Sequence, residues 1–304
     1  HHRPFKPASC CCCCLPKNQT ELPYKPLYPS AMEENPKKKA KVGAESEEAE
    51  PITKDGDMPQ KKFYRSRAHC NPLSHNDLFD YPVDPSKSSW EKFYPNHNGR
   101  PISFIDVGCG FGGLTVSLAK EFPDKLVLGM EIRPKVTEYV RLRIEALRKQ
   151  NPGEYQNAAV LRTNAMRYLP NFFKKGEIEK MFFCFPDPHF KAKNHRRRIV
   201  NTALLGEYAH FLRPGGRLYA VTDVEDLHNW HVEKCTNHPC FRPLTEEEMA
   251  ADPCVTLIRT ETEESKKVER AGSGKYHAVF ERVPDAAVRA PPFADLFRDF
   301  LPPP

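Results

Sequence analysis

The sequence predicts an α/β protein with a doubly wound, mostly parallel sheet and an antiparallel strand near the C-terminus. Three observations lead to this class. Short apolar runs alternate with helix-like segments, a glycine-rich stretch follows the first run, and an acidic residue closes each of the first two runs or lies near its end. Strand–helix alternation favours parallel strands joined by right-handed crossovers. The expected fold is therefore Rossmann-like.

The strands are expected where short apolar runs are bounded by turn residues. Parallel strands covered on both faces are mostly apolar, as these runs are. The runs are 102–107, 126–132, 158–162, 180–185 and 217–222. Two later strands are expected at 255–260 and 276–282, with no strong helix between them, which predicts the antiparallel end of the sheet.

The clearest predicted helix is Pro134–Gln150, where apolar residues recur at helical spacing and charged residues occupy the other side. A second is expected at 200–212, because Arg-Pro-Gly-Gly at 213–216 is typical of a helix end. A third is expected near 226–235. It carries His228 and His231, but a histidine pair on a polar helix is more typical of a surface than of a metal site, so no metal is expected.

The chain is expected to contain one folded domain at 99–283. A basic extension, 61–98, would pack on it, and 284–304 would form a flexible tail. Residues 1–60 are rich in proline and charge and are expected to be disordered. We expect residues 1–31 to be absent from the native protein, because Met32 is a plausible start. The basic run 36–42 predicts import into the nucleus.

Composition sets limits on the function class. The net charge of +6 fits a polyanionic partner and equally a soluble basic protein. Five of the eleven cysteines form one run, 10–14, and the other six show no C-x-x-C pair. Neither a zinc ribbon nor a disulfide ladder is therefore expected, and the thiols are expected to be reduced in an intracellular compartment. No apolar stretch approaches the roughly 18 residues of a membrane span.

The glycine-rich stretch 106–113 predicts a nucleotide-type ligand at the end of the first strand. Its glycines fit either a dinucleotide loop or the loop that binds S-adenosylmethionine around Gly108 and Gly110. Asp106 favours the second, because a carboxylate repels a pyrophosphate and attracts an ammonium group. Glu131 ends the second strand and can accept from both ribose hydroxyls of either cofactor.

Two later strand ends also carry candidate site residues. Asn164 and Ala165 follow the third strand, where the side chain or the backbone could bond an adenine, although an Asn in a tight turn fits equally. The fourth strand leads into Pro-Asp-Pro-His, in which Asp187 stands between two prolines that restrict the backbone. Such a carboxylate can accept from N1–H and the exocyclic amine of guanine. The alternative is a rigid turn capped by Asp.

Basic residues gather in two places, and both predict contacts with nucleic-acid phosphates. One cluster follows Asp187 directly, and the other lies in the extension, interleaved with Phe63 and Tyr64, which could stack on bases or anchor the segment. The predicted RNA-binding residues are Lys61, Lys62, Arg65, Arg67, His189, Lys191, Lys193, Arg196, Arg197 and Arg198.

Taken together, these motifs resemble the catalytic subunit of eukaryotic tRNA (guanine-N7-)-methyltransferases, from about residue 61 to 283. The resemblance rests on D-x-G-C-G-F-G-G, G-M-E-I-R, R-T-N-A-M, F-P-D-P-H-F-K, L-R-P-G-G and T-E-T-E-E-S-K-K. F-P-D-P-H-F-K is highly specific and the glycine loop is not. Nothing before about residue 60 matches. The family's fold is that of class I methyltransferases, which agrees with the predicted sheet.

The resemblance implies S-adenosylmethionine as cofactor, a variable-loop guanine of tRNA as substrate, and a noncatalytic WD-repeat propeller subunit as partner. It implies cofactor contacts at Gly108, Glu131, Ile132, Arg133, Asn164, Ala165, Cys184, Thr262 and Glu264, with Asp187 as the active-site acid. Cys184 stands where relatives often carry Leu, which a backbone contact would tolerate. Two other functions fit parts of the pattern, a nicotinamide-dependent oxidoreductase and a noncatalytic RNA-binding scaffold.

Overall fold

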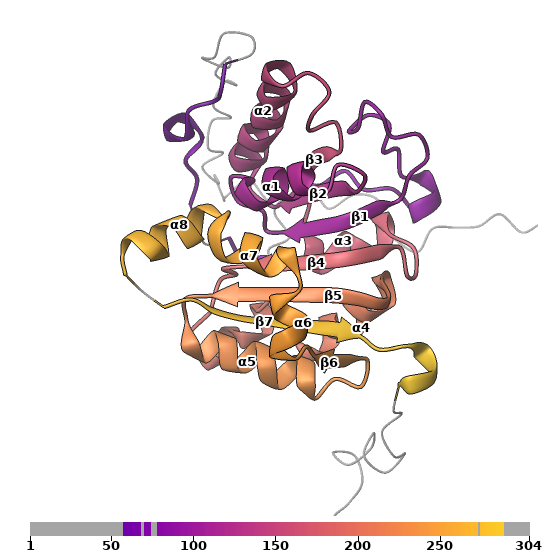
Figure 1. Cartoon of the computed structure of the whole chain (residues 1–304), viewed down its shortest axis with the longest axis vertical. Helices are drawn as coiled ribbons and strands as arrows, with labels where there is room; N and C mark the ends of the chain where they lie inside the picture. The colour runs from indigo at the N-terminus through magenta and orange to yellow at the C-terminus, as the bar shows by residue number, and fades with distance from the viewer. Residues whose placement is uncertain (1–56, 68–69, 74–77, 273, 289–304) are drawn as a thin grey trace, which may run out of the picture. The chain divides into compact units, whose positions relative to one another are not determined.

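The computed structural model describes residues 57–67, 70–73, 78–272 and 274–288. The predicted import signal at 36–42 and most of both predicted tails lie outside these residues. The described part contains one sheet of seven strands in the order β3-β2-β1-β4-β5-β7-β6 (Figure 1). The strands are β1 Ile102–Val107, β2 Leu126–Glu131, β3 Ala158–Arg162, β4 Ile178–Cys184, β5 Leu212–Thr222, β6 Phe241–Pro243 and β7 Tyr276–Arg282.

The first five strands are parallel, and the order reverses between β1 and β4. Ligands in such sheets bind outside the carboxyl ends of the strands at this switch point. β7 runs antiparallel to β5 and β6 runs antiparallel to β7. The predicted doubly wound, mostly parallel sheet is therefore confirmed, and the antiparallel end contains two strands.

Helices cover both faces of the sheet. α1 (Gly113–Glu121), α2 (Pro134–Gln150) and α7 (Pro253–Thr260) pack on one face, while α3 (Ala165–Phe172), α4 (Thr202–Phe211) and α5 (Glu225–Thr236) pack on the other (Figure 1). Neighbouring strand residues serve opposite faces, since Phe182 belongs to one buried cluster and Phe183 to the other. Shorter elements are α6 (Glu246–Ala250), α8 (Glu263–Arg270), η1 (Lys61–Tyr64), η2 (Pro85–Lys87), η3 (Ala192–Arg197) and η4 (Asp285–Ala287).

The extension packs on the domain at several places. Trp90 and Tyr94 are buried in the core, and the Tyr94 hydroxyl donates to the carbonyl of Val127 at 3.0 Å. Closer to the N-terminus, the Tyr64 ring lies 5.7 Å from that of Tyr139 on α2. Part of residues 61–98 therefore completes the hydrophobic core.

The expected strand at 255–260 is wrong, because this segment is the helix α7. Asp252 caps it by accepting from the amide of Cys254 at 3.0 Å, and Pro253 occupies the first turn. Cys254, Val255 and Ile258 then bury one helical face. The helix α8 also separates α7 from β7, where no strong helix was expected.

The expected helix end at Leu212 is displaced by a short distance. α4 ends at Phe211, and Arg-Pro-Gly-Gly lies inside β5. The carboxyl ends of β1, β2, β3 and β4 lie within one residue of the expected positions, and these ends are the part of the sheet that matters most for the site.

None of the described helices is long and apolar enough to span a membrane. Among the described residues, no group of three or more potential metal ligands comes together.

Candidate active site

The glycine loop between β1 and α1 is open where a ligand would approach. Gly108 and Gly110 have φ values of 75° and 55°, and no atom lies within 4 Å of the position that a Cβ would take. Gly112, at φ 76°, serves packing instead, because its Cβ would lie 2.7 Å from Cγ1 of Val140. The loop is fixed by the amides of Gly108 and Cys109, which donate to the carbonyl of Met130 at 2.8 and 3.0 Å.

Asp106 ends up as a buried carboxyl group under this loop. Its residue is 1% exposed, and the Thr115 hydroxyl donates to Oδ2 at 2.7 Å. Burial raises the pKa of Asp106 to about 7, and Glu263 and Glu131 add to the increase. The carboxyl group is thus half protonated near neutral pH, so a cation that reaches it gains a partner and displaces a proton.

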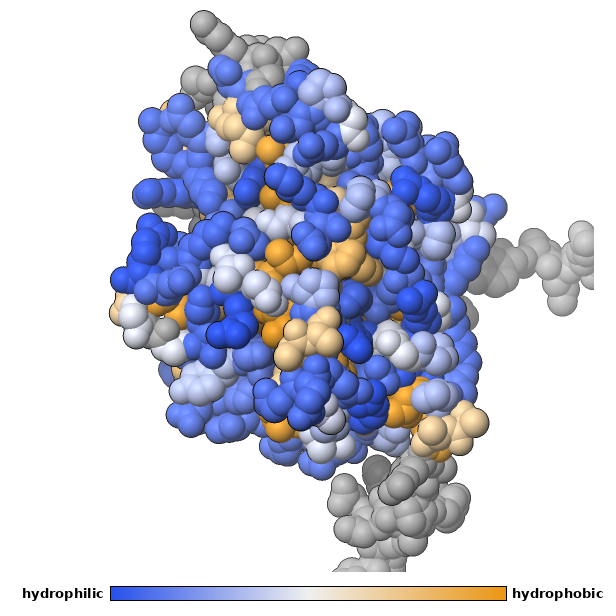
Figure 2. Space-filling model, viewed as in Figure 1, coloured by the Kyte–Doolittle hydropathy of each residue, from blue (hydrophilic) through white to orange (hydrophobic). Residues whose placement is uncertain are grey.

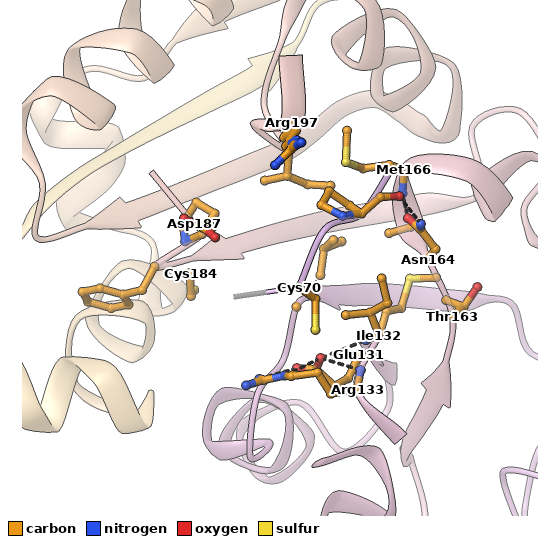
Figure 3. Close-up of a pocket in the computed structure, with 18 of the residues that line it drawn as sticks. Cys70, Glu131, Ile132, Arg133, Thr163, Asn164, Met166, Cys184, Asp187 and Arg197 are labelled. Atoms are coloured by element: carbon orange, nitrogen blue, oxygen red, sulfur yellow. Dashed lines mark hydrogen bonds and ion pairs between the residues drawn. The ribbon is translucent and has the colours of Figure 1, made fainter. Parts of the chain in front are cut away.

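Glu131 organises the end of β2. Its carboxylate accepts from the amides of Ile132 and Arg133 at 2.8 and 3.0 Å, and from the amide of Gly110 at 3.1 Å. The Arg133 guanidinium adds two bonds, from Nε at 3.0 Å and from Nη2 at 2.8 Å (Figure 3). Glu131 therefore joins the glycine loop to the end of β2, and its oxygens already have partners that a ribose would share or displace.

The side chain of Asn164 is already hydrogen-bonded within the protein. The amide oxygen accepts from the amide of Met166 at 3.1 Å and caps α3, while Nδ2 donates to the carbonyl of Pro72 at 2.6 Å (Figure 3). The neighbouring Thr163 is different, because its buried Oγ1 has no partner among the described residues. Sequence reasoning singled out Asn164 and overlooked Thr163, the adjacent hydroxyl that retains a free bonding capacity.

Two adjoining hollows surround these residues. The first is lined by residues at the ends of β2 and β3, together with Cys70 and Pro72 from the extension (Figure 3). The second lies over the glycine loop and reaches the start of α8. Six residues line both hollows, namely Gly108, Arg133, Cys184, Phe185, Pro186 and Asp187. Asp187 therefore stands where the two hollows meet.

The Asp187 segment has an unusual backbone on both sides of its prolines. Phe185 and His189 have φ values of 51° and 45°, a region that bulky residues rarely adopt. The amide of Phe185 donates to Val221 at 2.8 Å, which fixes the segment to β5. The Asp187 carboxylate accepts from the amide of His189 at 3.3 Å, and its side chain keeps 28% exposure. Backbone strain of this kind is typical of functional sites.

The start of α8 reaches the glycine loop through Glu263, which sequence reasoning did not select. Its carboxylate accepts from the amide of Gly113 at 3.2 Å, from Arg143 at 2.9 Å and from Lys61 at 3.1 Å. Burial would raise the pKa of Glu263, but these two cations outweigh it and hold the pKa below its ordinary value. In a run of consecutive acids the sequence gives no sign of which one faces inward.

The predicted cofactor residues Thr262 and Glu264 also line the second hollow. Thr262 is the cap of α8 and accepts from the amide of Ser265 at 2.8 Å. Glu264 forms an exposed ion pair with Lys267 at 2.6 Å. Of the other predicted residues, Ile132, Ala165 and Cys184 line the first hollow. All of the predicted cofactor residues therefore lie around the two hollows.

The predicted RNA-binding residues separate into different environments. Lys62, Arg65, Arg67, Lys191, Lys193 and Arg196 are exposed. Lys61 is paired with Glu263, and Arg197 and His189 line the first hollow. Arg198 is only 5% exposed, so its placement does not suit the expected phosphate contact. On the face shown in Figure 2 hydrophilic residues predominate and apolar ones form small separate areas.

Comparisons with known proteins place these features in a family. Residues 100–278 match the family described as "Putative methyltransferase". The tRNA (guanine-N(7)-)-methyltransferase of Caenorhabditis elegans is 52% identical over 76% of this chain and 91% of its own length. The protein of the same name from Schizosaccharomyces pombe is 50% identical over 76% and 88%. Among solved structures, the 16S rRNA methyltransferase KamB is 15% identical over 67% of this chain and 100% of its own, with a TM-score of 0.44.

The segment that matches the family, 100–278, contains nearly all of the residues that line the two hollows. It includes every residue that lines the second hollow, and every residue that lines the first except Cys70 and Pro72. These two belong to the extension, which contributes a wall to the first hollow.

Proposed function

Because this chain belongs to the family of tRNA (guanine-N(7)-)-methyltransferases, we propose that its two hollows hold S-adenosylmethionine and that Asp187 orients the guanine beside it. The reaction is methylation of N7 of a guanine in tRNA. The observation that carries the proposal is the position of Asp187, which lines both hollows at their junction. The adenosine part would occupy the first hollow and the methionine part the second.

The residues present fit this cofactor. The open sides of Gly108 and Gly110 leave room for a ligand against the backbone, and Asp106 beneath them suits the methionine ammonium. In the first hollow, the unpaired Thr163 hydroxyl offers a donor and an acceptor to the adenosine part. Glu131 would hold the ribose once its bonds to Arg133 rearrange.

The chemistry asks little of the protein beyond orientation and charge. Guanine N7 carries a lone pair, so no general base is needed before attack. S-adenosylmethionine, when bound, supplies an electrophilic methyl group on a sulfonium. Asp187 accepts from N1–H and the exocyclic amine of guanine, which holds the base and stabilises the positive charge that develops on it. Holding two reactants in line in this way can supply roughly 7–11 kcal/mol.

Ligand-induced stabilisation tests the choice of cofactor. S-adenosylmethionine at about 100 times its dissociation constant should stabilise the chain by about 2.7 kcal/mol, which raises the melting temperature by several degrees. NAD at the same concentration should leave the melting temperature unchanged. The reverse result would support an oxidoreductase and contradict the proposal.

Cofactor affinity should depend on pH through Asp106. With a pKa of about 7, the free carboxyl group is protonated below that pH, and only its ionised form attracts the ammonium. The dissociation constant of S-adenosylmethionine should therefore rise by up to roughly tenfold per pH unit below 7 and level off above it. Titration calorimetry from pH 5.5 to 8 measures this, and Asp106→Asn should bind more weakly with a flat profile. A sloping profile in Asp106→Asn would assign the effect to another group.

We propose that the exposed lysines and Arg196 after Asp187 bind tRNA phosphates. Lys191, Lys193 and Arg196 are exposed and follow the active-site acid within ten residues. Replacing all three with Ala should reduce the slope of log affinity against log salt by roughly two units, because each lost phosphate contact accounts for about 0.7–0.9. An unchanged slope, measured with tRNA at several salt concentrations, would remove these contacts.

We also propose that a WD-repeat propeller subunit binds at the segment before η2. Leu78, Tyr81 and Val83 are 91%, 50% and 87% exposed, an unusual apolar group on one short segment. Replacing Leu78 and Val83 with Ser should abolish complex formation in size-exclusion chromatography without lowering the melting temperature. Val232→Ser, an exposed apolar position on α5, serves as the control. A complex that survives the double change would place the partner elsewhere.

A further inference from the structure

Arg198 is the most buried member of the basic run. It follows η3 directly and is 5% exposed. Its Nε donates to the carbonyl of Pro188 at 2.9 Å, and the guanidinium carbon lies 4.6 Å from the centre of the Trp230 ring. The contacts that hold the guanidinium are thus a carbonyl and an aromatic face, in place of the phosphate expected from the sequence.

Trp230 holds a fixed orientation on α5. Its indole Nε1 donates to the carbonyl of Val200 at 2.7 Å, and Lys234 lies over the ring at 4.6 Å. The ring of His195, which belongs to η3, is 5.2 Å away. A guanidinium on an indole face gains a cation–π attraction that increases as water is excluded. The helix therefore offers a rigid platform on which the Arg198 guanidinium rests.

The bond from Arg198 to Pro188 reaches the residue next to Asp187. The Pro188 carbonyl belongs to the peptide that joins Pro188 to His189, and the amide of that same peptide donates to the Asp187 carboxylate at 3.3 Å. The bond from Arg198 joins the two ends of the segment 188–198, which also contains the left-handed His189. A rotation of the Pro188 carbonyl would turn the Pro188–His189 peptide and move the amide that holds the Asp187 carboxylate.

We propose that Arg198 and Trp230 form a positioning pair, in which the guanidinium held on the indole fixes the Pro188 carbonyl and so sets the angle at which Asp187 meets the guanine. The proposal rests on the function proposed above, since it assigns Asp187 to the base. It places α5, which lines neither hollow, in control of the rate of methyl transfer. It also excludes Arg198 from the phosphate contacts.

The test compares single-turnover methyl transfer with binding. Arg198→Gln and Trp230→Leu should each lower the transfer rate by about tenfold, because small misplacements of reacting groups are costly. The dissociation constants for S-adenosylmethionine and tRNA, and the salt dependence of tRNA binding, should stay within twofold of the parent values. The transfer rate of the double variant should also be about tenfold below that of the parent, because both changes disrupt the same Arg198–Trp230 contact. Trp230→Phe, which keeps an aromatic face, should recover most of the rate.

Matched controls separate positioning from stability. Trp90→Phe alters the other tryptophan, which is buried against Phe173 and lines neither hollow, and should lower the melting temperature with no change in the transfer rate. Arg213→Lys alters an exposed arginine paired with Glu179 and should change neither. The inference is overturned if Arg198→Gln flattens the salt dependence, if the two losses multiply to a hundredfold, or if the rates do not fall. If the unaltered protein transfers no methyl group, the proposed function has failed instead.

Discussion

Replacing Asp187 with Ala is expected to lower the rate of methyl transfer by roughly 10²–10³-fold, the usual cost of removing a preorganised group that stabilises developing charge. The carboxylate lies at the junction of the two hollows and is held by a backbone with two left-handed residues beside it. Its loss would leave the donor groups of the guanine edge without an acceptor and the positive charge on the methylated base without a counter-charge.

Cofactor affinity distinguishes this role from a general loss of structure. In Asp187→Ala, the dissociation constant of S-adenosylmethionine should stay within about threefold, because Glu131 and Asp106 remain in place to hold the cofactor. Asp187→Asn, which is nearly isosteric, should lose activity to a similar extent, since the amide cannot accept from both guanine donors. Near-normal turnover in either variant would show that another group orients the base.

Replacing Glu131 with Ala is expected to weaken binding of S-adenosylmethionine by at least about 100-fold. The carboxylate accepts five hydrogen bonds, from Gly110, Ile132 and three donors of Arg133, and it would also accept from the ribose. Bonds to a charged group contribute about 1.5–3 kcal/mol each, and the change releases the glycine loop as well as the ribose.

The kinetic signature of Glu131→Ala should be the reverse of that of Asp187→Ala. Raising the concentration of S-adenosylmethionine should restore most of the transfer rate, because the guanine side of the site is intact. Glu131→Gln, which keeps one acceptor, should show an intermediate affinity in equilibrium dialysis. Unchanged affinity in Glu131→Ala would contradict the ribose contact and leave Glu131 as a structural residue of the loop.

The parts of the fold that sequence predicts well are those in which one local pattern is decisive. β1, β3 and α2 have the expected bounds, because their apolar runs and helical spacing leave no competing interpretation. Parallel strands bring their carboxyl ends to one edge of the sheet, and this rule alone predicts that Asp106, Glu131, Asn164 and Asp187 surround a common site. In the structure, Glu131, Asn164 and Asp187 line the first hollow, and Asp106 and Asp187 line the second.

The missed features depend on contacts between distant segments. The run 255–260 is apolar enough for a strand, and only the cap at Asp252 and burial against the sheet decide for a helix. Arg198 looks like its exposed neighbour Arg196 until α5 places Trp230 beside it. Cys70 and Pro72 line the first hollow through a chain path that no local motif indicates.

The proposed activity of this chain is transfer of a methyl group from S-adenosylmethionine to guanine N7 in tRNA. Incubation of the protein with tRNA and methyl-labelled S-adenosylmethionine, followed by chemical cleavage at N7-methylguanine, measures this most directly. We expect label in tRNA and cleavage at one guanine of the variable loop, with both signals lost in Asp187→Ala. Label at another atom, or no transfer to tRNA with and without the proposed WD-repeat subunit, would contradict this activity.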